Sequence, residues 1–268
     1  MTWPTTPVAT GNVDAGTDSP ASARADLLDL IQKANQMIAD VPVGRLLNVQ
    51  VFAASDGTDF TGAYTPTPGT RVSVIKAVAG GGGSGGCYSA PAGYAAGSGA
   101  GASGNYAELA IVNPTSQSIT VGGGGAPGWG GATGGRGGNT SMGSIFTLYG
   151  GYGGGAGVAR NSFPYPGGDA AAQNPATSST FSGCTVYQNI AGGTSDKRAI
   201  ILTQGYVQES AHSPSPMGNG HPGGIPGEYV NTRYGYGWGA SGVRTVSGES
   251  SSRGIGGAPG CMIIYEYS

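Results

Sequence analysis

The stretch that decides the fold is Arg71–Gly86, RVSVIKAVAGGGGSGG. Its first half has apolar, β-branched residues at Val72, Val74 and Val78, which favour a pleated, half-buried strand. Its second half is almost unbroken glycine, which has no side chain to pack and loses more conformational entropy on ordering than any other residue. A strand that passes directly into glycine recurs downstream, so we expect the whole fold to repeat this junction.

The composition is that of an ordered chain with a thin side-chain core. The chain has 268 residues, of which 38% are hydrophobic and 10% are charged, and its formal net charge is −2. Such a low charge argues against disorder through self-repulsion. Six of the 55 glycines precede residue 80, and each ordered glycine costs about 0.5–1 kcal/mol relative to alanine. We therefore expect dense backbone hydrogen bonding, close backbone packing and burial between subunits.

Several function classes lack their sequence signals. The twelve Lys and Arg residues form no basic stripe of the kind that binds nucleic acid. No apolar run reaches the roughly 20 residues of a membrane-spanning helix, and the first ten residues, MTWPTTPVAT, do not read as a signal peptide. Cys87, Cys184 and Cys261 lack metal-site spacing. We expect no metal, no cofactor and synthesis in a reducing cytoplasm.

One segment has helical periodicity: residues 14–42, DAGTDSPASARADLLDLIQKANQMIADVP. Ser19 is a suitable N-cap, Pro20 suits the first helical position and Pro42 ends the helix. Apolar residues recur at spacings of three and four, which is the pattern of a short coiled-coil seam. These residues are Leu27, Leu30, Ala34, Met37 and Val41. We predict an oligomerisation helix; the alternative is a helix that lies on its own domain.

From Gly44 onward the periodicity is that of strands. Leu47–Ala53 alternates apolar and polar residues, and the Arg71 strand follows a turn-rich stretch. Short strands separated by turn signals, with no second helix, predict a mainly β fold, a glycine-rich antiparallel β-sandwich with long loops. We divide the chain into an N-terminal attachment segment with its helix (1–43) and a glycine-rich β domain (44–268). The further strands that we expect are Tyr106–Val112, Gln117–Val121, Ile145–Tyr149, Arg198–Thr203 and Cys261–Tyr267.

The glycine runs at 80–86, 122–138, 150–157 and 254–260 have two interpretations. They lack the strict glycine at every third position that a collagen triple helix needs. Loops and extended, polyglycine-II-like segments packed side by side both stay open. Between the runs lie long variegated stretches at 88–103, 158–195 and 205–252, which we interpret as loops.

Catalytic motifs are weak in this chain. Gly82–Gly86, GGSGG, matches the nucleophile-elbow pattern, but a polyglycine run matches it through composition alone and no helix follows. His212 and His221 lie in loops without a second metal-ligand cluster. The acidic residues beyond the helix are scattered and give no paired-carboxylate pattern of the glycosidase type. We expect no enzymatic activity; a surface-glycan depolymerase is the minor alternative.

A binding loop is the stronger prediction. Residues 229–244, YVNTRYGYGWGASGVR, combine aromatic rings and arginines with glycine and serine, a composition also found in antibody paratopes. We predict an exposed contact loop at the end distal to the helix. The alternative is that the rings cover bare glycine backbone. The contact residues that we predict are Tyr229, Arg233, Tyr234, Tyr236, Trp238 and Arg244.

The order of strands and glycine runs resembles a known family. GAYTPTPGTRVSVIKAVAGGGGSGG is followed by GNYAELAIV, SQSITVGGGGAPG, GGNTSMGSIFTLYGGYGGGAG and PGCMIIYEYS. This order resembles the glycine-rich C-terminal domain of bacteriophage and prophage tail fibres, and DAGTDSPASARADLLDLIQKANQM resembles the lead-in helix of such proteins. Unlike phage adhesins that stack polyglycine helices, this chain has clear strands and no regular glycine-motif repeat.

The resemblance implies a homotrimeric, non-enzymatic receptor-binding protein of the virion, at a tail fibre or tail tip. It implies attachment to other tail or baseplate proteins through the N-terminus, and recognition of a glycan, pilin or outer-membrane protein on the host bacterium. A structural glycine-rich scaffold of the cell-surface or ice-binding kind is the alternative. Such a scaffold would show regular repeats with flat Thr or Ala rows, whereas the inserts here all differ.

Overall fold

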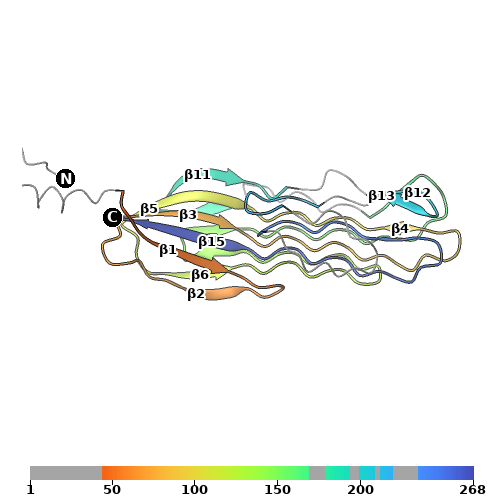
Figure 1. Ribbon diagram of the computed structural model, residues 1–268, viewed down its shortest axis with the longest axis horizontal. Coiled ribbons are helices and arrows are strands. Elements are labelled where there is room, and N and C mark those ends of the chain that lie inside the picture. The colour runs from red at the N-terminus through yellow and green to blue at the C-terminus, as the bar shows by residue number, and fades with distance from the viewer. Residues whose placement is uncertain (1–43, 169–178, 194–198, 209–211, 220–234) are drawn as a thin grey trace, which may run out of the picture.

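The computed structural model describes residues 44–168, 179–193, 199–208, 212–219 and 235–268. These residues form an elongated molecule, with a β-sandwich at the end where β1 begins and a bundle of glycine-rich segments beyond it (Figure 1). The predicted helix, its seam residues Leu27, Leu30, Ala34, Met37 and Val41, and the whole segment 1–43 lie outside the described residues.

The described residues contain strands and no helix. The first eight strands are β1 (Leu46–Ala53), β2 (Phe60–Tyr64), β3 (Val72–Val78), β4 (Ala96–Gly97), β5 (Tyr106–Val112), β6 (Gln117–Val121), β7 (Thr140–Met142) and β8 (Phe146–Leu148). The others are β9 (Tyr165–Pro166), β10 (Thr180–Phe181), β11 (Thr185–Ile190), β12 (Ile200–Thr203), β13 (Tyr206–Gln208), β14 (Arg244–Thr245) and β15 (Cys261–Tyr267).

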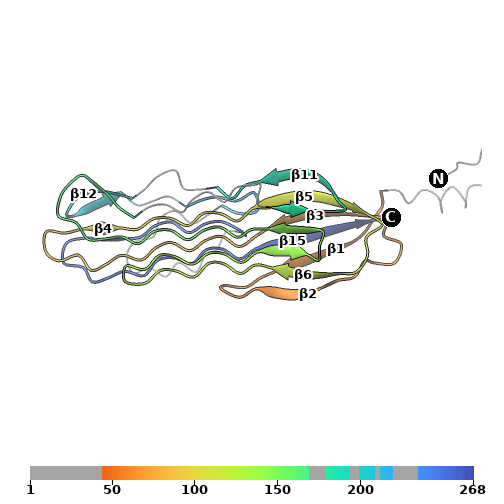
Figure 2. The ribbon, with the colours of Figure 1, turned by 180° about the vertical axis from the view of Figure 1, so that it is seen from behind.

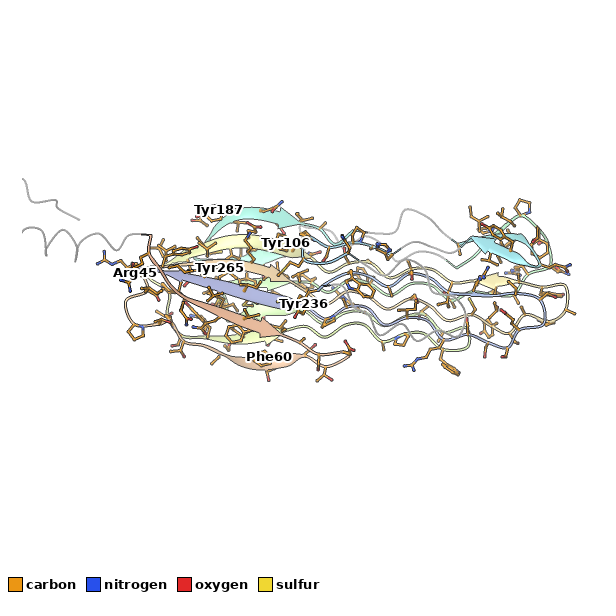
Figure 3. The ribbon with its side chains drawn as sticks, in the orientation of Figure 1. Arg45, Phe60, Tyr106, Tyr187, Tyr236 and Tyr265 are labelled. Carbon is orange, nitrogen blue, oxygen red and sulfur yellow. The ribbon has the colours of Figure 1, made fainter. Side chains whose placement is uncertain are left out.

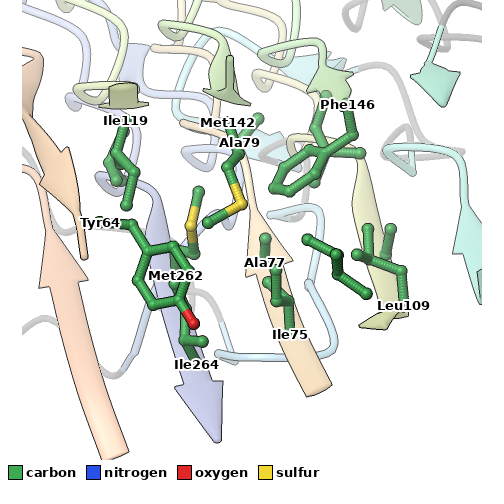
Figure 4. Packing of buried hydrophobic residues seen from close by; sticks show 14 of the residues in the cluster. Tyr64, Ile75, Ala77, Ala79, Leu109, Ile119, Met142, Phe146, Met262 and Ile264 are labelled. Carbon is green, nitrogen blue, oxygen red and sulfur yellow. The ribbon is translucent and has the colours of Figure 1, made fainter. Parts of the chain in front are cut away.

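Two five-stranded antiparallel sheets pack face to face in the sandwich, with strand orders β1-β15-β3-β5-β11 and β10-β8-β7-β6-β2 (Figure 2). Alternate residues of each strand point between the sheets, as the twofold period of a strand requires. In β3 these are Ser73, Ile75 and Ala77, all buried. Figure 4 shows the core between the sheets, which includes Tyr64, Ile75, Leu109, Ile119, Met142, Phe146, Met262 and Ile264.

Residues Arg71–Gly86, the strand that passes into glycine, form the axis of the molecule. β3 is the middle strand of the first sheet, and the chain continues from it into residues 79–87, every one of which is buried. The N–H groups of these residues point in turn to three neighbouring segments, a repeat of three residues per turn like that of polyproline II. The donor–acceptor pairs are Ala79–Asn105, Gly82–Ala102 and Gly85–Gly99; Gly80–Gly138, Gly83–Gly135 and Gly86–Ala132; and Gly81–Ala258, Ser84–Ile255 and Cys87–Ser252, at 2.8–3.1 Å.

These three acceptor segments run antiparallel to residues 79–87, because the acceptor numbers fall by three as the donor numbers rise by three. Three parallel segments donate to the carbonyl groups of the axis: Gly125 to Gly81, Gly151 to Gly80, and Ala240 to Gly82. Hydrogen bonds between neighbouring outer segments close a ring of six segments around the axis, in which antiparallel and parallel segments alternate. Their order around the ring is 98–105, 149–157, 132–138, 122–128, 252–260 and 237–243. We call this hexagonal arrangement around residues 79–87 the glycine bundle.

Close backbone approach explains why the axis is glycine. A Cβ atom added to Gly81, Gly82 or Gly85 would lie 1.9–2.0 Å from a backbone oxygen of a neighbouring segment. Ser84 interrupts the run because its hydroxyl has a partner, accepting a hydrogen bond from the N–H of Ile255 at 2.8 Å. Large side chains on the outer segments 132–138 and 149–157 contact each other: the guanidinium of Arg136 lies 4.6 Å from the ring centroid of Tyr152.

The predicted strands are largely confirmed, and the glycine runs are extended and packed side by side. The predictions over Tyr106–Val112, Gln117–Val121 and Cys261–Tyr267 coincide with β5, β6 and β15. The interpretation of 88–103, 158–195 and 205–252 as single loops was wrong. The first contains β4 and residues 98–103 of the glycine bundle, the second contains β9, β10 and β11, and the third contains residues 237–243 of the glycine bundle.

Candidate binding surface at the distal end

Loops join the segments of the glycine bundle at the end farthest from the sandwich (Figures 1 and 2). They include residues 88–95, 129–131, 158–164 and 246–251, together with the short β12–β13 connection. Because each segment of the bundle is fixed by hydrogen bonds to its neighbours, both ends of each of these loops start from a defined position. We call this end the distal surface.

Backbone hydrogen bonds hold the distal loops to one another. Ala95 and Arg160 exchange a pair of N–H···O bonds, each 2.9 Å long. Ala90 donates to the carbonyl of Glu249 at 3.0 Å and accepts from the N–H of Gly248 at 2.8 Å. Loops from three distant parts of the sequence therefore form one connected surface.

A small hydrophobic cluster lies beneath these loops. Ala95, Ala199, Ile201 and Val207 are buried together, with Phe163 and Val246 packed against them. β12 pairs with β13 and β9, and β14 pairs with β4, so two small sheets frame the cluster. The distal surface has its own core, which gives the exposed side chains a firm support.

Large aromatic side chains project from this support. Tyr88, Trp129 and Tyr206 are 49%, 64% and 56% exposed. The ring of Tyr88 lies over the backbone of Gly131, where an added Cβ would come within 2.3 Å of it, and Trp129 forms a backbone bridge with Arg253. Tyr88, Trp129 and Arg253 are thus neighbours where two bundle segments turn. Such rings can stack on sugar faces or fill apolar notches, and arginines can pair with carboxylate or phosphate.

The structure corrects the prediction for Trp238. Its side chain is only 2% exposed and packs with Ala240, Ala258 and Ile255 inside the glycine bundle. Tyr236 is half-buried and packs beside Tyr106 at the sandwich end (Figure 3). The prediction of an exposed contact loop is therefore wrong for Trp238, because residues 237–243 are a bundle segment and not a loop.

The other predicted contact residues fall in two groups. Arg244 lies at the distal end, in β14, paired with Gly97 of β4 and half-buried. Tyr229, Arg233 and Tyr234 lie outside the described residues, as does His221.

Sequence reasoning missed Tyr88 and Trp129. Each stands at the end of a glycine run, in GGCYSAP and in APGWGGA. A single large aromatic residue at a point where a glycine run turns was the signal that could have indicated an exposed ring. Treating residues 122–138 as one continuous run concealed the turn at Trp129, which separates an outward segment from a returning one.

Three of the side chains weighed as catalytic candidates, Ser84, Glu266 and Glu108, have hydrogen-bond partners within the fold. Ser84 is fully buried and hydrogen-bonded as described above. Burial alone would raise the pKa of Glu266, but hydrogen bonds from the Thr67 hydroxyl, the Thr67 N–H and Tyr64 outweigh it and hold this pKa below its usual value. A hydrogen bond from Tyr106 likewise lowers the pKa of Glu108. Among the described residues, no group of three or more His, Cys, Asp or Glu side chains could hold a metal ion.

No protein-family model matches the chain, and no curated protein matches it in sequence. The part of the chain that the structure describes contains no helix that could span a membrane.

Proposed function

We propose that this protein is the receptor-binding protein of a bacteriophage tail fibre or tail tip, and that its distal surface adsorbs to a structure on the host bacterium. The observation that carries the proposal is the set of exposed rings, Tyr88, Trp129 and Tyr206, on loops fixed at the far end of the glycine bundle. The resemblance of the strand and glycine order to tail-fibre domains supports the same function.

The geometry suits adsorption. The extended segments of the glycine bundle are hydrogen-bonded to one another along their length. The bundle therefore acts as a spacer that holds the distal loops away from the sandwich. Rigid aromatic anchors on supported loops lose little conformational entropy on binding, which favours affinity. Recognition by such a surface needs no catalytic group, and we propose a non-enzymatic adhesin that binds a glycan, pilin or outer-membrane protein.

The remaining parts of the proposal concern assembly. Residues 1–43 attach the protein to other tail or baseplate components, and the seam at Leu27, Leu30, Ala34, Met37 and Val41 joins three chains. Three copies of a weak distal surface would act together through avidity. The protein is then part of the virion, made in the cytoplasm of the infected cell.

The test is adsorption to whole cells. Labelled full-length protein is incubated with a panel of bacterial strains, and a strain that retains it is used for the variants. Interface anchors of this type cost about 2 kcal/mol or more when truncated, roughly thirtyfold in affinity. The Tyr88→Ala/Trp129→Ala variant should therefore lose adsorption while keeping its thermal melting temperature.

Tyr152→Ala is the matched control, because Tyr152 is an exposed ring on the flank of the glycine bundle. It should adsorb like the wild type. Equal adsorption by the Tyr88→Ala/Trp129→Ala variant, or retention by no strain of a broad panel, would contradict the proposal. Release of oligosaccharides from the cells would favour the depolymerase alternative.

A further inference from the structure

The outer face of the sheet β1-β15-β3-β5-β11 is the feature that the distal surface does not explain. The strand registers place its outward residues in four rows across the sheet. The row nearest the glycine bundle is Ala53, Cys261, Val78, Tyr106 and Ile190. The middle of this row is covered, because Met217 and Tyr236 pack against Val78, Tyr106 and Cys261, whereas Ala53 at the β1 edge is exposed. Figure 3 shows Tyr265, Tyr106 and Tyr236 in succession from the sandwich toward the bundle.

The other three rows are mostly apolar. Their side chains are exposed on β1 and at the end of β5, half-buried on β15 and β3, and Ala110 is buried. From the end of the molecule inward, the rows are Leu46, Tyr267, Val72 and Val112; Val49, Tyr265, Val74, Ala110 and Thr185; and Val51, Ile263, Lys76, Glu108 and Gln188. We call these three rows the open face. At its margins Val51 is 60% exposed and Val112 is 67% exposed.

The open face spans a considerable area of the sandwich surface. Strands lie about 4.8 Å apart and rise about 3.4 Å per residue, so its five strands and about six residues of length span roughly 400–500 Å². The face also holds Lys76, Glu108, Gln188 and Thr185. The largest apolar patch of a soluble monomer usually spans about 300–600 Å² and is often functional, so a face of this span is a candidate interaction site. An isolated exposed valine would need no explanation, but an ordered array of valine, isoleucine and tyrosine does.

We propose that the open face is a self-association surface, which packs against the open faces of further copies of this chain with their bundles parallel. Its charge fits a self-contact. Lys76 and Glu108 form an ion pair at 3.2 Å on the face itself, so its charged centre is neutral and two such faces do not repel each other. Apolar strands on both sides can interdigitate as the two layers of a sandwich do.

The size of the open face also fits this occupant. Two open faces packed together would bury roughly 800–1,000 Å² in total, which is the low end of the range for specific interfaces. We therefore expect an association that depends on protein concentration. This contact lies at the sandwich and leaves the distal surfaces free.

The proposal is tested on the full chain by sedimentation equilibrium at micromolar concentration. The wild type should give a multiple of the 26.3 kDa chain mass. Val51→Glu/Val112→Glu places charges at two highly exposed positions, so the fold should survive while the dissociation constant of the oligomer rises at least thirtyfold. The milder Val51→Thr/Val112→Thr keeps shape and strand propensity, and should weaken association in the same direction. Leu202→Glu, an exposed strand residue at the distal end, is the control and should leave the mass unchanged.

A monomeric wild type would overturn the proposal and leave the open face to residues 1–43 or to a tail protein. Unchanged oligomer mass in both open-face variants, with unchanged melting temperature, would also overturn it and place the interface elsewhere. The readout is mass and does not involve host cells, so this proposal and the adsorption proposal fail independently.

Discussion

A Cβ atom added to Gly82 would lie 1.9 Å from the carbonyl oxygen of Tyr152. Gly256 lies in an outer segment of the same bundle, and a Cβ added there meets the carbonyl oxygen of Gly125 at an ordinary 3.6 Å. We therefore expect Gly82→Ala to force two backbones apart and to lower the free energy of unfolding by about 1–3 kcal/mol or more. Gly256→Ala should be neutral or stabilising by up to about 1 kcal/mol, since it restricts the unfolded chain. Denaturant unfolding measures both, and equal stabilities would contradict the packed bundle.

The two tryptophans of the described chain should behave in opposite ways. Trp238→Ala removes a buried ring from the glycine bundle and should destabilise the protein by about 3–5 kcal/mol. Trp129→Ala removes a ring that is mostly in solvent, and its effect should stay within about 0.5 kcal/mol. Thermal and denaturant unfolding of the two variants compare them directly. A stable Trp238→Ala protein would return that residue to the exposed loop predicted from sequence.

The strands were predictable because their signal is local. Cys261–Tyr267 and Tyr106–Val112 are short apolar runs bounded by turn residues, and each pairs with β3. β11 was missed because its residues, TVYQNI, are exposed along most of an edge strand and show no clean alternation. Edge strands carry a weak pattern since only part of one face is buried.

The glycine bundle and the distal surface were less predictable for a different reason. A bundle segment is identified by which other segments surround it, and glycine has no side chain to record that information. Residues 237–243 show this most clearly. Their alternation of rings and glycine favoured an extended display loop, but the segment is hydrogen-bonded to residues 79–87, 98–105 and 252–260 of the bundle and buries Trp238.

The hydroxyl of Ser84 should have a structural role and no catalytic one. Ser84→Ala leaves the N–H of Ile255 without this acceptor, at a cost of about 1–3 kcal/mol in unfolding free energy. Adsorption measured well below the melting temperature should be unchanged. Loss of adsorption in a folded Ser84→Ala protein would contradict the assignment of this residue to packing.

The buried carboxylate of Glu266 predicts a pH-dependent stability. Its folded-state pKa is lower than the ordinary glutamate value, so its contribution to stability is present above about pH 4.3, the unfolded value, and is lost as the pH falls through the folded value. In Glu266→Gln an NH₂ group replaces one of the two carboxylate oxygens. The side chain can then no longer accept all three hydrogen bonds from Thr67 and Tyr64. The melting temperature of the variant should be lower than that of the wild type near pH 7, and the difference should shrink in acid. A difference that stays constant from pH 7 to pH 3 would contradict this assignment.

Amide hydrogen exchange over residues 79–87 tests the central claim most directly, because these residues are the axis around which the structure is built. Each of their N–H groups donates to one of three surrounding segments, and all of these residues are buried. The account predicts that these amides are among the slowest in the protein to exchange and open only with global unfolding, at the same rate as the middle of β3. Exchange within seconds, at the rate of an unstructured glycine linker, would contradict it.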